Sequence, residues 1–359
     1  MHCKCLVVPS ALLAFVIAVS PALANETINR KHGEKSLAGE VTGVSKTEVT
    51  LKSSSKGETI KVPANEIVSI DWTGDPPDLK VARSDENGMR LQKAVDGYQK
   101  SLAATKATDK AAKADLEFAI ARTTAKMALS DPAKVDDAIK KLEDFRTKQS
   151  DHYRFYEAVN YLGQLYAAKK DFIKAKVTFE QLGKAPWTET QMASRIASGR
   201  LLLAENKLDE AAVEYEAVIA IQPEGPLEES VRQEAVLGKS RIMIAQKKYD
   251  DALKLLGEVI AKAPADDVKV NAEAFLRQGD CLREQGNDKD ALLAYLHVDV
   301  LFRSEKAIHA EALYRLSQLW DKVGQKARGE EARDLLRSEY ESSEWARQLK
   351  APAATGAGG

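Results

Sequence analysis

The spacing of apolar and polar residues divides the chain into a short alternating region and a long helical one. Between residues 37 and 72, apolar and polar side chains alternate, and Val, Thr and Ile are frequent. A period of two predicts half-buried β-strands. The expected strands are Leu37–Val44, Glu48–Ser53, Glu58–Val62 and Val68–Trp72. Such short strands predict a small β domain, residues 36–73, folded as a meander or a small barrel.

After Trp72 the pattern changes to that of amphipathic helices. The run Gly74-Asp75-Pro76-Pro77 marks the boundary, because Pro is favoured at the start of a helix. From there to about residue 345, apolar residues recur with helical spacing in segments separated by Gly, Asn and Pro. We therefore expect a mostly α protein that begins with a small β unit.

The helical region also repeats itself. Three positions recur at an interval of 36 residues: Gly163 and Gly199, Ala175 and Ala211, and Phe179 and Tyr215. Leu162-Gly163-x-x-Tyr166 followed by Ala175-x-x-x-Phe179 resembles the tetratricopeptide repeat (TPR) family, whose unit is two antiparallel helices. The resemblance covers about residues 78–345 and implies an α-solenoid of about seven helix pairs. The β region resembles an SH3-like or Sm-like barrel more weakly.

The two ends of the chain have compositions of their own. Lys4, an apolar stretch from Leu6 to Val19 and Ala22-Leu23-Ala24 have the layout of a secretory signal peptide, residues 1–24. The alternative is an uncleaved anchor. We therefore expect an exported protein, in a bacterial periplasm or a similar compartment. Residues 350–359 are mostly small, and we expect a disordered tail there.

Charge and cysteine content narrow the function classes. The chain has 53 Lys and Arg against 54 Asp and Glu, a formal charge of −1, which disfavours nucleic acid as a partner. After cleavage one cysteine, Cys281, remains. An internal disulfide is then impossible, and we expect Cys281 to be a packed helix residue.

Motifs for chemistry are missing from the sequence. It contains no Walker loop, no Gly-x-Ser-x-Gly and no Gly-x-Gly-x-x-Gly. Its histidines do not have metal-ligand spacing. We therefore expect no enzyme activity, no cofactor and no bound metal.

The family resemblance implies a concave groove, lined by the first helix of each pair, that binds extended peptides or partner helices. The family's groove positions fall on Asn160, Gln164, Arg200, Arg241, Leu276, Asp280, Arg283, Tyr314 and Gln318. Arg200 and Arg241 occupy equivalent positions, where stacked guanidinium groups would grip a carboxylate or an acidic segment. The alternative is that both are solvated or paired with nearby glutamates. The family's carboxylate clamp of Lys and Asn is not reproduced.

These observations predict a non-catalytic exported scaffold that binds a protein or peptide partner in the groove. An accessory factor or divergent enzyme acting on cell-envelope polysaccharide is the alternative, and a band of aromatic side chains suited to sugar stacking would favour it. Self-association by stacking of solenoids is a third possibility.

Overall fold

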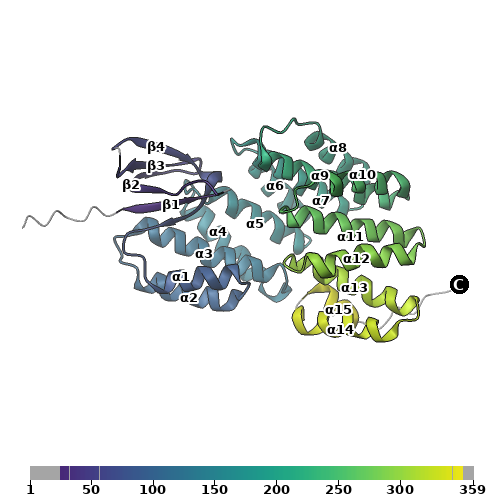
Figure 1. Ribbon diagram of the computed structural model, residues 1–359. Helices are drawn as coiled ribbons and strands as arrows, with labels where there is room; N and C mark the ends of the chain where they lie inside the picture. The colour runs from purple at the N-terminus through teal and green to yellow at the C-terminus, as the bar shows by residue number, and fades with distance from the viewer. Residues whose placement is uncertain (1–24, 32, 56, 342, 351–359) are drawn as a thin grey trace, which may run out of the picture.

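The computed structural model describes residues 25–31, 33–55, 57–341 and 343–350 (Figure 1). The expected signal peptide lies outside these residues, and so does the expected disordered tail except for Lys350, which ends the last helix. In the described residues an antiparallel sheet comes first and a long array of helices follows.

The sheet has five strands in the order β4-β3-β2-β1-β5. Its strands are β1 (Glu26–Arg30), β2 (Leu37–Val44), β3 (Glu48–Ser53), β4 (Thr59–Pro63) and β5 (Ile67–Asp71). The four predicted strands are present as β2 to β5. Strands β2, β3 and β4 form the expected meander, whereas β5 pairs with β1 at the other edge of the sheet. Strand β1 was not predicted, so the sheet begins before the expected boundary at residue 36.

The missed strand has an almost wholly polar sequence. Ile28 is the one fully buried side chain of β1, so no apolar alternation marks it. Strand β3 shows the opposite case, because Val49 and Leu51 alternate with polar residues and are both buried. Tyr153, from the turn before α5, completes the sheet's core. The sheet is therefore built partly on a side chain of the helical region.

In the described part of the chain, the helices form seven antiparallel pairs and a final short helix. The helices are α1 (Asp78–Asn87), α2 (Leu91–Ala104), α3 (Lys110–Ala128), α4 (Val135–Lys148), α5 (Phe155–Ala168), α6 (Phe172–Leu182), α7 (Thr188–Ala204), α8 (Leu208–Ile219), α9 (Pro226–Ala245), α10 (Tyr249–Lys262), α11 (Val268–Glu284), α12 (Asp288–Leu301), α13 (Lys306–Lys322), α14 (Lys326–Glu339) and α15 (Glu344–Lys350). The predicted solenoid of about seven helix pairs is confirmed.

Close contact between small and aromatic residues explains the repeat. A Cβ atom added to Gly163 would lie closer than 3.0 Å to the ring of Phe179, and one added to Gly279 would clash equally with Tyr295. The first helix of a pair therefore needs a small residue where the aromatic ring of its partner packs. Ser240 precedes Leu256 by the same interval and is fully buried, so Ser240 keeps the register in that repeat.

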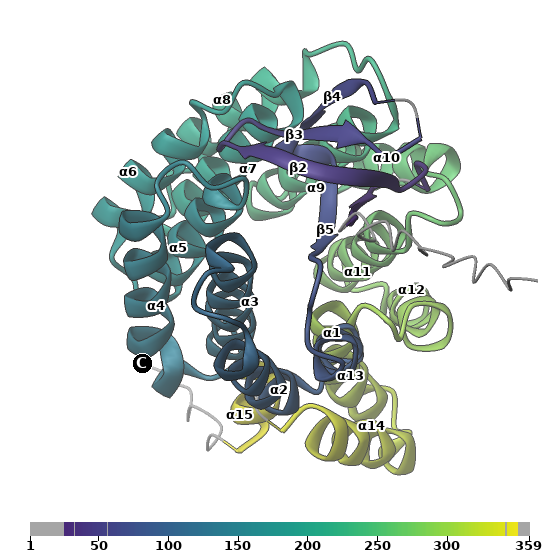
Figure 2. The ribbon, with the colours of Figure 1, turned by 90° about the vertical axis from the view of Figure 1, so that its left-hand side faces the viewer.

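The array curves back toward its own beginning. Figure 2 shows the helices winding round a central space, with α3 and α11 nearer to its centre than α4 and α12. The guanidinium of Arg347, on α15, donates a hydrogen bond of 3.2 Å to the carbonyl of Ser130, just after α3. The first helices of the pairs thus face a common concave side, and the sheet lies across one part of it (Figure 2).

Candidate functional site

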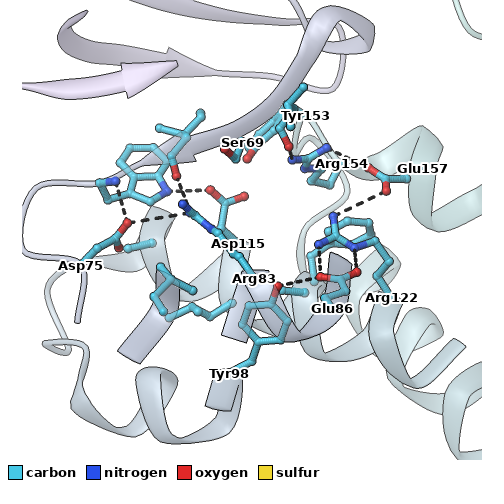
Figure 3. Close-up of a pocket in the computed structure, with 18 of the residues that line it drawn as sticks. Ser69, Asp75, Arg83, Glu86, Tyr98, Asp115, Arg122, Tyr153, Arg154 and Glu157 are labelled. Carbon is cyan, nitrogen blue, oxygen red and sulfur yellow. Dashed lines mark hydrogen bonds and ion pairs between the residues drawn. The ribbon is translucent and has the colours of Figure 1, made fainter. Parts of the chain in front are cut away.

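A polar pocket lies where the sheet meets the first helices (Figure 3). Its volume is about 270 Å³, and its walls come from β5, α1, α3 and the residues around the start of α5. No sequence motif indicated this pocket, because its lining residues are spread along the chain from Val68 to Glu157. We call it the junction pocket.

Glu86, on α1, is the centre of a charge network in the junction pocket. Its carboxylate accepts hydrogen bonds from Arg122 at 2.7 and 2.8 Å and from Lys126 at 2.8 Å. The Tyr98 hydroxyl donates to it at 2.6 Å. Burial by itself would raise the pKa of Glu86, but the two cations lower it to about 2. Glu86 is therefore ionised near neutral pH and ties α1 and α2 to α3.

Arg154 fastens the sheet to the helices. Its guanidinium donates hydrogen bonds to the carbonyls of Ile67 and Val68 on β5 and, at 2.8 Å, to the carboxylate of Glu157. The Arg154 side chain is 9% exposed. A buried guanidinium without partners would be costly, so these contacts hold β5 in one position.

Trp72 and Asp115 form a second contact between the β region and the helices. The Trp72 indole donates to Asp115 Oδ2 at 2.6 Å, and His152 Nε2 lies 3.6 Å from Asp115 Oδ1. His152 Nδ1 accepts a hydrogen bond from the Arg154 backbone, which leaves the ring proton on Nε2, facing Asp115. Burial lowers the pKa of His152, so the ring is neutral near pH 7.

Each carboxylate of the junction pocket has at least one partner within the protein, although Asp115 Oδ1 and His152 Nε2 are buried without a hydrogen bond among the described residues. Asp75 accepts from the Trp72 backbone at 2.9 Å, and the other three are held as described above. The hydrogen-bonded groups of this pocket hold the sheet against the helices. We interpret the junction pocket as a structural interface between the sheet and the helices.

A second pocket lies on the concave side, where Arg200 and Arg241 were expected. Its volume is about 80 Å³. It is lined by residues from four successive first helices and by one tyrosine of α8: Arg200, Tyr215, Glu234, Leu237, Gly238, Arg241, Lys269, Val270, Glu273 and Ile308. We call it the groove pocket.

Each groove-pocket arginine is paired with a glutamate of the next first helix. Arg200 donates to Glu234 at 3.0 Å, and Arg241 Nε donates to Glu273 at 3.0 Å. The structure therefore shows the alternative that we had left open, in which both arginines pair with glutamates. The arginine side chains are 53% and 40% exposed. The glutamates are more buried, 22% and 17% exposed, so the guanidinium groups are the part of each pair that a ligand carboxylate can reach.

Of the groove-pocket residues, only Arg200 and Arg241 were predicted, and among the others Tyr215 has the most unexpected origin. It belongs to a second helix, and family groove positions lie on first helices. A Cβ atom at Gly199 or at Gly238 would come within 3.0 Å of its ring. The ring therefore passes between α7 and α9, at two glycines, and reaches the concave side. The glycine at 238, two residues before the register position, was the available signal.

Other predicted groove residues are engaged elsewhere. Asn160 and Gln164, on α5, hydrogen-bond to each other at 3.2 Å. Asp280 is 7% exposed and accepts from the Tyr295 hydroxyl at 2.8 Å. Asp280 therefore belongs to the interior of its repeat.

The C-terminal candidates also differ in their surroundings. Arg283 donates to the neighbouring Glu284 at 2.7 Å. The Tyr314 ring lies 5.2 Å from that of Trp345 on α15, and Gln318 is exposed. Leu276 is fully buried in the core, so its assignment to the groove is wrong. The repeat positions alone therefore do not distinguish buried from exposed side chains on these helices.

The polysaccharide alternative would be favoured by aromatic side chains suited to sugar stacking, and two aromatic residues lie near Asn160. Tyr156 and Trp187 line a pocket of about 250 Å³ there. Their rings are 5.6 Å apart at 82°, and Trp187 packs against the sheet's core. Rings set edge to face and packed in this way do not offer the parallel open faces on which sugars stack.

The described residues show neither a metal site nor a membrane-spanning helix. Among them no group of three or more His, Cys, Asp or Glu side chains is arranged to hold a metal ion. None of the described helices is both long and apolar enough to cross a bilayer. Cys281 is fully buried and donates to the Tyr249 carbonyl at 3.2 Å. Burial raises the pKa of its thiol to about 11, as expected for a packed residue.

Comparison with known proteins agrees with this fold. A family model described as tetratricopeptide repeat matches residues 202–272. The structure of a tetratricopeptide repeat protein from Parabacteroides merdae has a TM-score of 0.50 at 12% identity, covering 76% of this chain and 96% of that one. The TPR2AB domain of yeast Sti1, in complex with pHSP90, has a TM-score of 0.29 at 16% identity, covering 76% of this chain and 94% of that one.

One curated relative matches part of the chain. DnaJ homolog subfamily C member 3 of Gallus gallus is 23% identical over 161 residues, which are 42% of this chain and 30% of that protein. The match thus spans less than a third of the relative. Residues 202–272 thus match the tetratricopeptide repeat model, and the seven helix pairs in the described residues have the fold of a tetratricopeptide repeat protein.

Proposed function

We propose that this protein is an exported, non-catalytic scaffold that binds a protein or peptide segment along its concave face. One observation carries the proposal: side chains of α7, α9, α11 and α13 converge on the groove pocket. A surface built from successive repeats suits an extended partner, because each repeat adds one more contact at a regular spacing.

The polar character of the groove supports a partner of mixed or acidic charge. Arg200 and Lys269 both pair with Glu234, at 3.0 and 2.5 Å. These cations are about half exposed. A partner carboxylate can approach these two cations from the groove, because their side chains are more exposed than that of Glu234.

The sheet is a second element of the proposed scaffold. It is fixed by Arg154, and Asn65 just before β5 donates to Glu189 of α7 at 2.5 Å. The sheet therefore acts as a rigid cap or second contact beside the groove. The compartment is part of the proposal and rests on the signal-peptide pattern of residues 1–24.

The proposal is tested by capturing partners from a cell-envelope extract. The test variant is Arg200→Glu with Arg241→Glu. A matched control is Lys254→Glu with Lys289→Glu, which changes the charge equally on exposed positions of α10 and α12. The proposal expects specific proteins to be captured by wild type and control but not by the test variant, with helicity unchanged. Equal capture by all three would refute it.

A further inference from the structure

Three repeats place a tyrosine at the same point of the second helix. Tyr98, Tyr215 and Tyr295 each follow an alanine by four positions, at Ala94, Ala211 and Ala291. All three rings are at most 1% exposed. A buried hydroxyl needs a hydrogen-bond partner, so the three sites can be compared directly.

Two of these hydroxyls donate to a carboxylate on the first helix of their own pair. Tyr295 donates to Asp280 at 2.8 Å, and Tyr98 donates to Glu86 at 2.6 Å. Cations hold both carboxylates in turn: Arg277 contacts Asp280, and Arg122 contacts Glu86. The recurring arrangement is a tyrosine hydroxyl, a carboxylate and an arginine.

The Tyr215 site has the hydroxyl and the arginines, but the hydroxyl donates to neither of the glutamates that pair with these arginines. Asp280 directly follows Gly279, whereas the residue that directly follows Gly199 is Arg200. The Tyr215 hydroxyl is buried and has no hydrogen-bond partner among the described residues. Burial and Glu273 raise the pKa of Tyr215, while Arg200 and Arg241 act to lower it, so both guanidinium groups and one carboxylate lie near the phenol.

The size and charge of the groove pocket fit one carboxylate group. Its charged lining consists of Arg200, Arg241 and Lys269 against Glu234 and Glu273, an excess of one positive charge. Its volume of about 80 Å³ admits a carboxylate with little more attached. A carboxylate there would accept from a phenol and from guanidinium groups, and charge-assisted hydrogen bonds of this kind are the strong ones.

We propose that the groove pocket binds a single carboxylate of the partner, with the Tyr215 hydroxyl, Arg200 and Arg241 as its donors. The ligand takes the place that Asp280 and Glu86 hold in the other two repeats. The carboxylate is a peptide C-terminus or an Asp or Glu side chain. This inference rests on the proposed function, because it names the chemistry of the partner at the same groove.

The first test uses propionate as the probe and propionamide as its neutral isostere. The signals of the Arg200 and Arg241 Nε–H groups are followed by NMR in the full chain. We expect saturable shifts with propionate and none with propionamide. Tyr215→Phe removes one oxygen atom and should weaken propionate binding about tenfold, the effect of losing a charge-assisted hydrogen bond. Equal affinity in wild type and Tyr215→Phe would overturn the assignment of Tyr215.

The second test identifies the source of the carboxylate with three peptides of equal length. One has a free C-terminus and no acidic residue, one is amidated with a central Glu, and one is amidated with a central Gln. We expect one of the first two to bind and to weaken in Tyr215→Phe, and the third not to bind. Binding of propionate without either peptide would contradict a partner segment as the ligand.

The outcomes separate this inference from the proposed function. If Arg200→Glu with Arg241→Glu abolishes partner capture but Tyr215→Phe alters neither capture nor propionate binding, the groove function stands and the carboxylate site fails. If propionate binding depends on Tyr215 while partner capture survives both arginine changes, the site stands and the groove function fails.

Discussion

Removing the hydroxyl from each of the three equivalent tyrosines should have unequal effects on stability. Tyr295→Phe deletes a hydrogen bond of 2.8 Å to Asp280, and Tyr98→Phe deletes one of 2.6 Å to Glu86. Both acceptors are buried carboxylates. Hydrogen bonds to charged groups contribute about 1.5–3 kcal/mol, so each change should lower the local free energy of unfolding by that amount.

Tyr215→Phe should behave differently. Its hydroxyl is buried without a hydrogen-bond partner among the described residues, and such a group costs roughly 1–3 kcal/mol of desolvation. Phenylalanine has no such group and keeps the ring that packs between Gly199 and Gly238. We therefore expect the free energy of unfolding to stay the same or to rise by up to about 1 kcal/mol.

Hydrogen exchange is the suitable assay, because a solenoid can open locally and a single unfolding midpoint would average over repeats. Amides of α2, α8 and α12 report the three sites separately. We expect the amides of α2 to lose protection in Tyr98→Phe and those of α12 to lose protection in Tyr295→Phe. The amides of α8 should keep their protection in Tyr215→Phe. A loss in α8 as large as that in α12 would show that the Tyr215 hydroxyl has a partner in solution, and the reasoning would fail.

Three further predictions concern charge, packing and the junction. The pKa values of Glu86 and Glu273 are lowered from 4.5 to about 2 in the folded chain. The unfolded chain therefore binds more protons in that range, and stability should fall as the pH drops from about 4.5 to 2. The free energy of unfolding, measured with urea, should depend less on pH in this range for Glu86→Gln than for the wild type. Gly238→Ala should cost about 1–3 kcal/mol by overpacking, because its Cβ would meet the Tyr215 ring. Gly257→Ala, with nothing within 4 Å, should be neutral or stabilising by up to about 1 kcal/mol in the same denaturation assay. Arg154→Met leaves Glu157 without its closest cation and two β5 carbonyls without a donor, so β5 amides should lose exchange protection while those of α12 keep theirs. Retained protection in β5 would contradict the role of Arg154 as the fastening.

The repeat pattern predicted the helical part because its packing is local. Gly163 and Phe179 lie in adjacent helices, and their contact reappears 36 residues later at Gly199 and Tyr215. A contact that recurs at a fixed interval can be recognised in a single sequence. Strand β1 was missed because it has one buried apolar residue, Ile28, and its pairing with β5 involves residues about 40 positions away.

The sequence predicted that Arg200 and Arg241 lie near each other, but it did not predict which residues they pair with. The interval between repeats placed Arg200 and Arg241 on the same pocket. Their pairing with Glu234 and Glu273 could not be inferred, because it depends on how far each first helix is shifted along its neighbour. The same reason hid Tyr215, whose access to the groove depends on an extra glycine at 238.

Site-specific photocrosslinking tests the central claim, that the concave face holds the partner, most directly. A benzoylphenylalanine at Ile308, which lines the groove pocket, is compared with one at Lys254, an exposed position of α10. Both variants are irradiated in a cell-envelope extract. The account predicts that a defined partner crosslinks from position 308 and not from 254, and that Arg200→Glu with Arg241→Glu abolishes the product. A partner that crosslinks from 254 and not from 308 would contradict it.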